Sequence, residues 1–280
     1  MRRYMRKITF VSAGMLTVAL LVLLSFSLIA CDTDSPEDLE RLVVGAVAVP
    51  HAEILDFLTY KLRGEGVELE IEIYSDYVLP NIALDAGEID ANFFQHIPYL
   101  ESFNMENGTD LRSVRGVHFE PLALYPGKTV SLDHIPTAAT VAIPRDPTNG
   151  ARALNLLQDA GLITLSEDVG FYTTYRDIVV NDYDLQFIEA EAAQLPVLLE
   201  DVNFAVINGN YALENGLSLD TALVAEERTS EAATRYTNYL VVRAERVNDA
   251  AIQKLADALN SEELRDFINE HYDGRVVPTF

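Results

Sequence analysis

The chain has 280 residues, of which 49% are hydrophobic, so it can bury a core large enough for one large domain or two α/β lobes. Its formal net charge is -24, and without the four basic residues that precede the first acid it has 16 basic and 44 acidic residues, a balance of -28. A surface this acidic repels phosphate backbones and anionic lipid head groups, which argues against a nucleic-acid-binding protein.

The first 30 residues have the pattern of an export signal. Basic MRRYMRK precedes an apolar run from Ile8 to Ala30, and the only cysteine, Cys31, follows it. The end of the run, LIAC, resembles a bacterial lipobox, which implies a cysteine that carries fatty acids such as palmitate and becomes the new N-terminus. The run is also long enough to span a bilayer as an uncleaved helix, and both alternatives tether the rest of the chain outside the cytoplasm.

Asp32 directly follows the cysteine. In a Gram-negative envelope, an aspartate at this place resembles the signal that retains a lipoprotein in the inner membrane. Residues 31–41, the lipidated cysteine and an acidic segment with Ser and Pro, are predicted to form a solvated tether. Because Cys31 has no second cysteine as a partner, the folded part must be stabilised by core packing alone.

Strands and helices are then predicted to alternate. Apolar or alternating runs indicate strands, and apolar residues at helical spacing, as in Ile54, Leu55, Leu58 and Leu62, indicate helices. The predicted strands cover 41–49, 67–74, 90–93, 114–125, 140–143, 186–188, 204–207 and 238–243. The predicted helices cover 51–66 and 78–86, begin near 98, and cover 149–160, 248–259 and 261–271. This alternation is typical of an α/β fold built from parallel βαβ units.

Sequence motifs for catalysis are absent. The chain has no Gly-x-Ser-x-Gly elbow and no glycine-rich phosphate loop, and its cysteine lies in the export segment. Its five histidines lack the short spacings of metal sites, although a site assembled in three dimensions stays open. We therefore predict no catalytic residue, no metal and no cofactor.

Aromatic and polar residues gather where predicted strands end. Residues 74–77 (YSDY) and 92–99 (NFFQHIPY) place several aromatic rings and a histidine beside two strand-to-helix turns. Such rings suit an apolar, polarisable ligand such as a thioether, although ordinary core filling is the alternative for any one of them. Open α/β sheets bind ligands beyond the carboxyl ends of their strands, which favours a site here.

Two further clusters carry amides and a cation. In PRDPTNGAR, Thr148 and Asn149 stand where a helix cap is expected, and Arg152 is placed to bind a carboxylate with its two-pronged guanidinium. Arg152 as a solvated helix charge, or with an ion-pair partner inside this acidic protein, is the alternative. In AVINGNYA, Asn208 and Asn210 follow a buried strand, where amides suit the zwitterionic end of an amino acid or serve as turn residues.

With these motifs in place, the chain resembles the NlpA-type methionine-binding lipoproteins, the solute receptors of methionine ABC importers. The similar stretches span nearly all of residues 42–280 and include FFQHIPYL, VAIPRDPTNGARALNLLQDAGLI, AVINGNYALENGL and the closing VVPTF. The resemblance implies a type II periplasmic-binding-protein fold, with residues 42–125 plus 238–280 in one lobe and 126–237 in the other. It also implies a membrane-anchored extracytoplasmic receptor, not an enzyme, that captures methionine in the cleft and delivers it to a permease.

The family's site residues map onto this sequence position by position. An aromatic pocket for the ligand side chain is implied at Tyr77, Phe94, His96 and Tyr99. The resemblance makes Arg152 the carboxylate clamp and Asn149, Asn208 and Asn238 the ligands of the amino-acid backbone.

The sequence around the clamp departs from the family pattern at Gly150-Ala151, where the family has a glycine directly before the arginine. This leaves open a related solute, such as D-methionine or a methionine-containing dipeptide. An extracytoplasmic enzyme and an adhesin whose cleft is vestigial are the remaining alternatives.

Overall fold

The computed structural model describes residues 39–167, 173–229 and 231–280, and every structural statement below refers to these residues. The predicted signal peptide, Cys31 and the predicted tether up to residue 38 lie outside them. Residues 40–280 form one compact unit. No helix in the described ranges is long and apolar enough to cross a membrane.

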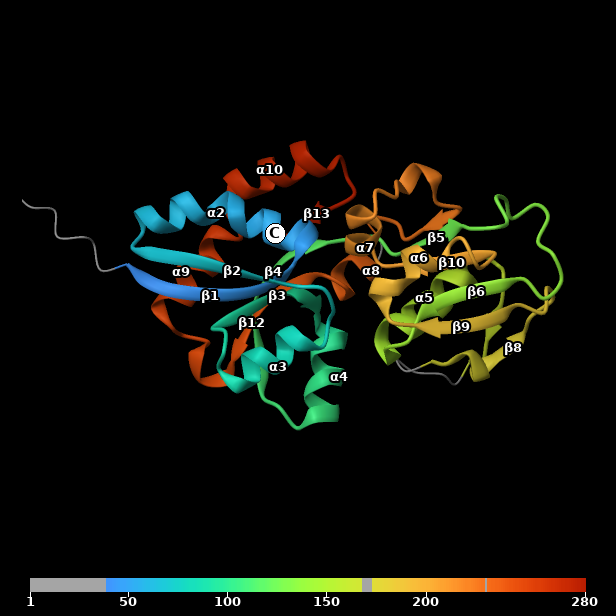
Figure 1. The fold of residues 1–280 in the computed structure, drawn as a ribbon, viewed down its shortest axis with the longest axis horizontal. Coiled ribbons are helices and arrows are strands. Elements are labelled where there is room, and N and C mark those ends of the chain that lie inside the picture. Colours follow the sequence, from blue (N-terminus) through green and yellow to red (C-terminus); the bar gives the residue numbers. More distant parts are fainter. Residues whose placement is uncertain (1–38, 168–172, 230) are drawn as a thin grey trace, which may run out of the picture. The chain divides into compact units, whose positions relative to one another are not determined.

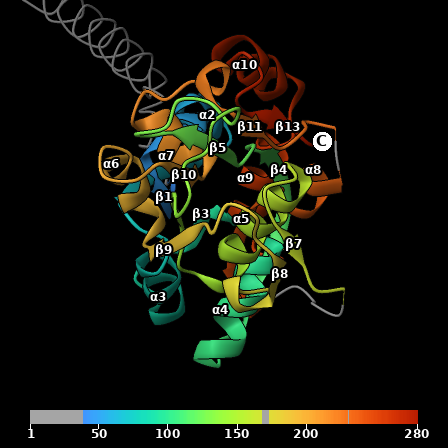
Figure 2. The same cartoon turned by 90° about the vertical axis from the view of Figure 1, so that its right-hand side faces the viewer.

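The described residues form two large sheets, and we call each of these with its helices a lobe (Figures 1 and 2). The sheet of lobe 1 has six strands in the order β13-β4-β12-β3-β1-β2. β1 pairs in parallel with β2 and β3, whereas β12 is antiparallel to β3 and β4. The strands are β1 (Glu40–Val47), β2 (Val67–Tyr74), β3 (Ala91–His96), β4 (Leu111–Phe119), β12 (Asn238–Arg243) and β13 (Val277–Pro278).

Helices cover both faces of this sheet (Figure 1). Alternation along β1 explains why, because Leu42 and Val44 pack on one face and Val43 packs on the other. The first face is covered by α2 (Glu53–Gly64), α9 (Ala250–Ala258) and α10 (Glu262–Tyr272), and the second by α3 (Leu79–Ala86) and α4 (Ile97–Asn107). A single helical turn of π type, η1 (Ala48–Ala52), joins β1 to α2.

The sheet of lobe 2 has five strands in the order β11-β5-β10-β6-β9. These are β5 (Ala123–Pro126), β6 (Thr140–Pro144), β9 (Gln186–Ala190), β10 (Phe204–Ile207) and β11 (Val224–Ala225). α5 (Pro147–Asp159) packs on one face, and α6 (Leu195–Leu198) and α7 (Gly209–Glu214) pack on the other. Two short strands, β7 (Thr164–Leu165) and β8 (Ile178–Val180), form a separate antiparallel pair. A short helix, α8 (Glu231–Arg235), precedes β12.

Most of the predicted elements are present, and the predicted strand at 114–125 is wrong in one respect. The structure divides it into β4, which ends at Phe119 in the first sheet, and β5, which begins at Ala123 in the second. The chain therefore crosses between the sheets at residues 120–122, whereas the sequence placed the change of lobe after residue 125. β12 returns the chain to the first sheet at Asn238, the residue where the second lobe change was predicted. β1 begins at Glu40, inside the segment predicted as tether.

Candidate functional site

A buried cavity lies between the two lobes. Its lining consists of Tyr77, Phe94, Gln95, His96, Tyr99, Glu120, Asn149, Arg152, Asn208, Gly209, Asn210 and Asn238. All eight residues that the sequence predicted for a ligand site are in this set. The cavity is narrow, since only about 20 Å³ of it admits the centre of a water molecule. Because its walls come from both lobes, a solute the size of an amino acid can enter only when the lobes move apart.

Aromatic rings form one end of the cavity. The rings of Tyr77 and Phe94 are 5.8 Å apart and nearly parallel, and Tyr99 meets each of them edge-on at 5.8 and 6.0 Å. Successive side chains of a strand point to opposite faces of the sheet, so in β3 Phe94 faces this cluster while Phe93 packs in the core of lobe 1. Tyr74, at the end of β2, packs in another part of the core. The structure thus offers an apolar, polarisable surface for a ligand side chain.

His96 is held neutral at the edge of this aromatic cluster. Its Nδ1 accepts the backbone N–H of Tyr99 at 3.2 Å and caps α4, so its proton is on Nε2, 3.1 Å from the side-chain oxygen of Asn149. Burial lowers the pKa of His96 to about 3, and the nearby Arg152 cation acts in the same direction. His96 therefore acts as a neutral hydrogen-bond donor between the lobes.

A chain of amides fixes the polar side of the cavity. Asp146 accepts the backbone N–H of Asn149 at 2.9 Å and the Asn149 side-chain amide with both carboxylate oxygens at 3.1 Å. The Asn149 oxygen consequently faces the other way and accepts the amide N–H of Asn208 at 2.9 Å. This leaves the oxygen of Asn208 buried without a hydrogen-bond partner in the described chain.

The prediction that Thr148 and Asn149 cap the helix is wrong. Asp146 is the N-cap, because Pro147 begins α5 and the Asp146 carboxylate accepts the backbone N–H two positions beyond it. The start of α5 is therefore already occupied by an anionic side chain. Burial raises the pKa of Asp146, and the hydrogen bonds from Asn149 and Thr148 oppose this upward shift.

Arg152 lines the cavity but is already paired on one side. Its Nε and Nη2 donate to the two carboxylate oxygens of Glu226 at 2.8 and 2.5 Å, and Nη2 also donates to the backbone oxygen of Glu120 at 3.0 Å. The ring of Tyr236 lies 4.1 Å from the guanidinium carbon. Arg152 therefore has an ion-pair partner inside the protein, Glu226, which was the alternative to a carboxylate clamp. Among the described residues, its Nη1 makes no hydrogen bond.

Several lining residues are not among the eight residues predicted as the ligand site, although Asn210 belongs to one of the candidate clusters. Asn210 accepts the Tyr77 hydroxyl across the lobes at 2.5 Å, and its amide nitrogen is buried without a partner among the described residues. Glu120 follows the end of β4 and was read as the interior of a strand. Asn210 lies within the AVINGNYA motif, so the sequence could indicate it as a site residue, whereas no local sequence pattern indicates Glu120. Gln95 turns away into a buried amide network with Asn81 and Asn92.

Two glycines allow the backbone to approach the site closely. A Cβ at Gly150 would lie 2.9 Å from the backbone oxygen of Pro144, so this position of α5 requires glycine against the end of β6. A Cβ at Gly209 would lie 2.7 Å from the Cβ of Glu120. The departure from the family pattern at Gly150-Ala151 therefore fits the local packing of α5.

Solved structures with a similar fold and substantial sequence identity are known. A protein from Ruminococcus gnavus superposes with a TM-score of 0.85 at 45% identity, over 86% of this chain and 100% of its own. A nutrient-binding protein from Burkholderia cenocepacia, solved bound to methionine, has a TM-score of 0.81 at 38% identity over 85% of this chain and 100% of its own. The fold is the type II periplasmic-binding-protein fold that the resemblance implied.

Sequence comparisons identify the family. The membrane lipoprotein TpN32 of Treponema pallidum is 38% identical over 260 residues, 93% of this chain and 95% of TpN32. The D-methionine-binding lipoprotein MetQ of Escherichia coli K12 is 35% identical over 257 residues, 90% of this chain and 93% of that protein. The sequence profile of the NlpA lipoproteins matches residues 42–280, almost the whole described part. The chain therefore belongs to the NlpA lipoprotein family, whose members in these comparisons are solute-binding proteins and not enzymes.

Proposed function

We propose that this protein is a lipid-anchored receptor on the extracytoplasmic face of the membrane that captures methionine and delivers it to the permease of an ABC importer. The observation that carries the proposal is the single buried cavity lined by all eight predicted site residues. The names of its relatives support the choice of solute, since one is a D-methionine-binding lipoprotein and another was solved with methionine bound.

The aromatic end of the cavity supports a thioether side chain. Tyr77, Phe94 and Tyr99 present ring faces and edges to the same space. Burying a methionine side chain contributes about 1.5–3 kcal/mol, and each sulfur–aromatic contact adds about 0.3–1.5 kcal/mol. An acidic side chain would be repelled by the ring faces and would lose its hydration in such a wall, so the cavity favours an apolar side chain over an acidic one.

The polar end supports the zwitterion. Nη1 of Arg152 and the amide nitrogen of Asn210 are donors for a carboxylate, and the oxygen of Asn208 is an acceptor for an ammonium group. Because Nε and Nη2 of Arg152 are committed to Glu226, we assign the carboxylate to Nη1 rather than to a two-pronged clamp. In this proposal Asn149 orients Asn208, while Asn238 completes the wall from β12.

Capture requires lobe movement and no chemical step. The closed arrangement is held across the cleft by the Tyr77 hydroxyl on Asn210 and by the Tyr211 hydroxyl on the backbone oxygen of Ser75, at 2.5 and 3.2 Å. A solute that bridges the two walls adds further bonds across the same gap, and the closed lobes then dock on the permease. After the costs of ordering, these contributions allow roughly −8 kcal/mol, which is micromolar affinity.

The membrane anchor belongs to the segment outside the described residues. Its support is the LIAC sequence ending at Cys31, together with relatives that are membrane lipoproteins. We expect Cys31→Ala to abolish lipidation. If the signal is then cleaved at an alternative site, the protein moves from the membrane fraction to the soluble extracytoplasmic fraction. If the signal is not cleaved, it stays attached to the protein. Intact mass of the membrane-extracted wild-type protein should show fatty-acyl chains, and an unmodified, uncleaved N-terminus would refute the anchor.

A larger related solute is the second candidate, and one observation favours it. Arg152 and Tyr236 also line an open groove on the lobe 2 side, and about 590 Å³ of this groove admits the centre of a water molecule. A residue added to methionine would have this space available beside Arg152, whereas the closed cavity leaves little room.

Native mass spectrometry of the purified protein tests the function directly, because a tightly bound solute keeps its mass in the complex. We expect an adduct of one methionine, or heat on titration with L-methionine that exceeds the heat with alanine. D-methionine and a methionine-containing dipeptide are titrated in parallel to rank the solutes. A protein that binds none of the three while remaining folded would refute the receptor assignment.

A further inference from the structure

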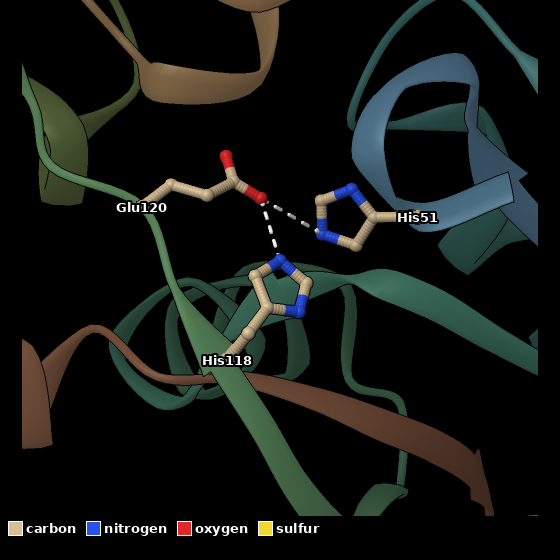
Figure 3. Close-up of side chains that lie close together, drawn as sticks. All are labelled: His51, His118 and Glu120. Atoms are coloured by element: carbon tan, nitrogen blue, oxygen red, sulfur yellow. Dashed lines mark hydrogen bonds and ion pairs between the residues drawn. The ribbon is translucent and has the colours of Figure 1, made fainter. Parts of the chain in front are cut away.

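A cluster of two histidines and a glutamate lies directly behind the cavity. Nε2 of His118 is 2.7 Å from Oε1 of Glu120, and Nε2 of His51 is 3.4 Å from the same oxygen (Figure 3). His51 comes from η1, while His118 and Glu120 flank the end of β4. All three side chains are buried, and Glu120 alone among them lines the cavity.

The imidazoles give Glu120 hydrogen bonds but no positive charge. Burial lowers the pKa of His51 to about 4 and that of His118 to about 3, so both rings are neutral at pH 7. Nε2 of His51 also lies 3.1 Å from the oxygen of Asn238, so it faces two acceptors and must carry the proton. Nδ1 of both rings is buried without a hydrogen-bond partner in the described chain, and a second proton there would be unsatisfied.

No arginine or lysine of the described residues forms an ion pair with the Glu120 carboxylate. Arg152 directs Nε and Nη2 to Glu226 and reaches only the backbone oxygen of Glu120. The backbone of Asn210 is a further influence on the pKa of this carboxylate, whereas the hydroxyls of Tyr77 and Tyr272 interact with it only electrostatically, because they donate to Asn210 and to Glu53. Burial accordingly raises the pKa of Glu120, with His51 and Arg152 opposing the shift.

The second carboxylate oxygen of Glu120 is turned away from both imidazoles (Figure 3). It makes no hydrogen bond with a described side chain, and the cavity that Glu120 lines is also lined by Asn208, whose buried side-chain oxygen has no partner in the described chain. A buried carboxylate is stable only with a cationic or multiply donating partner. Two acceptor side chains that line one cavity, one of them a carboxylate, match the three N–H donors of a primary ammonium group, whose positive charge stabilises the ionised form of Glu120.

We propose that Glu120 and Asn208 form a subsite for the primary ammonium group of the solute, with His51 and His118 as positioning residues that hold Glu120. The inference rests on the proposed function and narrows the substrate class to solutes with a free, protonated amine. Hydroxy-acid and N-acylated analogues of the same side chain are rejected. In them the hydroxyl or amide cannot neutralise the carboxylate.

A divalent cation would be the other partner for this cluster, since the three potential ligand atoms lie within 4.8 Å of one another. The hydrogen bonds favour the ammonium group. A metal ion bound to both Nε2 atoms would require the imidazole protons on Nδ1, and Nδ1 of His51 and of His118 is buried without a hydrogen-bond partner in the described chain.

Calorimetry of the full-length protein in detergent, with L-methionine and its 2-hydroxy analogue, tests the subsite. Wild type should prefer methionine by roughly 10- to 150-fold, the value of one charge-assisted hydrogen bond. Glu120→Gln should reduce this preference to less than about threefold, mainly by weakening methionine. Glu101→Gln, an exposed carboxylate on α4, is the control and should keep the full preference. Equal losses for both ligands in Glu120→Gln, or an unchanged preference, overturn the proposal.

The pH dependence of wild type provides a test that needs no substitution. Because only ionised Glu120 attracts the amine, methionine affinity should fall about tenfold per pH unit below the pKa of Glu120, and affinity for the hydroxy analogue should not. Parallel pH profiles for the two ligands overturn the subsite.

Two further outcomes separate the alternatives. Stabilisation of wild type by zinc chloride that is lost in His51→Ala, with no preference for methionine over its hydroxy analogue, overturns the subsite in favour of a metal site. If wild type binds no methionine, the proposed function fails on its own account. The subsite is then judged by thermal shift with the common amino acids: stabilisation that Glu120→Gln abolishes supports it, and no stabilisation by any of them overturns it.

Discussion

The buried pair of Arg152 and Glu226 allows a stability prediction that can be separated from ligand binding. The two side chains are 4% and 9% exposed and share two hydrogen bonds of 2.8 and 2.5 Å. Arg152→Met leaves the Glu226 carboxylate buried without its cation, which should reduce the free energy of unfolding by about 3–5 kcal/mol. A domain of ordinary stability, about 5–15 kcal/mol, remains folded after this loss over most of that range.

The double variant Arg152→Met, Glu226→Gln should recover much of the loss. It contains no buried charge, and the Gln oxygen can still accept the backbone N–H of Leu122, which Glu226 accepts at 2.9 Å. We therefore expect a cost of about 1–3 kcal/mol relative to wild type, from hydrogen bonds that the amide and the Glu120 backbone oxygen lose. Methionine binding should nevertheless stay at least tenfold weaker than wild type, because Nη1 is gone.

Urea unfolding followed by circular dichroism measures the stabilities. The exposed pair of Arg41 and Glu70 is a matched control, with the same two-pronged geometry at 2.6 Å but side chains that are 65% and 47% exposed. Its double variant, Arg41→Met with Glu70→Gln, should cost less than about 1 kcal/mol. The reasoning is refuted if Arg152→Met costs no more than this control, or if the double variant at the buried pair is no more stable than Arg152→Met alone.

Three further predictions concern ligand binding and the buried histidines. Phe94→Ala should weaken methionine by roughly 1.5–3 kcal/mol but alanine by much less, since it removes the wall for the side chain; equal losses in calorimetry would contradict this. Tyr77→Phe should lower methionine affinity by about 1 kcal/mol through loss of the interlobe hydrogen bond to Asn210, while Tyr60→Phe, on an exposed ring, should change nothing. Unfolding below neutral pH should become easier because His51, His96 and His118 are buried as neutral rings.

The sign of this last effect follows from the lowered pKa values. The unfolded chain gains protons on its histidines below about pH 6.5, while the folded chain keeps the three rings neutral down to about pH 4 for His51 and about pH 3 for His96 and His118. The contribution of these histidines to the free energy of unfolding is therefore fully present above pH 6.5. It falls by about 1.4 kcal/mol per pH unit for each ring as the pH decreases toward 4. Imidazole NMR signals assigned to His51, His96 or His118 that titrate near pH 6.5 in the folded protein would show that these rings are not held neutral.

The sequence was sufficient to place the aromatic wall and most amides, because local rules decide them. Alternation in β3 sends Phe93 to the core and Phe94 to the cavity, and AVINGNYA ends a buried strand at Asn208. Such positions depend on the strand period and on where a strand stops, and both are visible in a few consecutive residues.

What the sequence did not reveal depends on contacts between distant segments. Glu226 is 74 residues from Arg152, and His51 is far along the chain from His118, so neither partnership leaves a short motif. Glu120 was hidden for another reason. The run from Val114 to Tyr125 has the composition of one strand, but the chain leaves the first sheet after Phe119 and enters the second at Ala123, so Glu120 lies at the crossing and not within a strand.

These distant contacts have a common effect, which is to orient each polar atom of the cavity from behind. Asp146 orients Asn149, which orients Asn208, and the hydroxyl of Tyr77 orients Asn210. The oxygen of Asn208 and the amide nitrogen of Asn210 remain unpartnered in the closed cavity, and each such atom costs about 1–3 kcal/mol when buried. A zwitterion that bonds both atoms removes this cost, whereas opening of the lobes removes it by hydration. In the proposed receptor the solute therefore favours closure, and we infer that the two unsatisfied amide atoms link lobe closure to recognition of the amino-acid backbone.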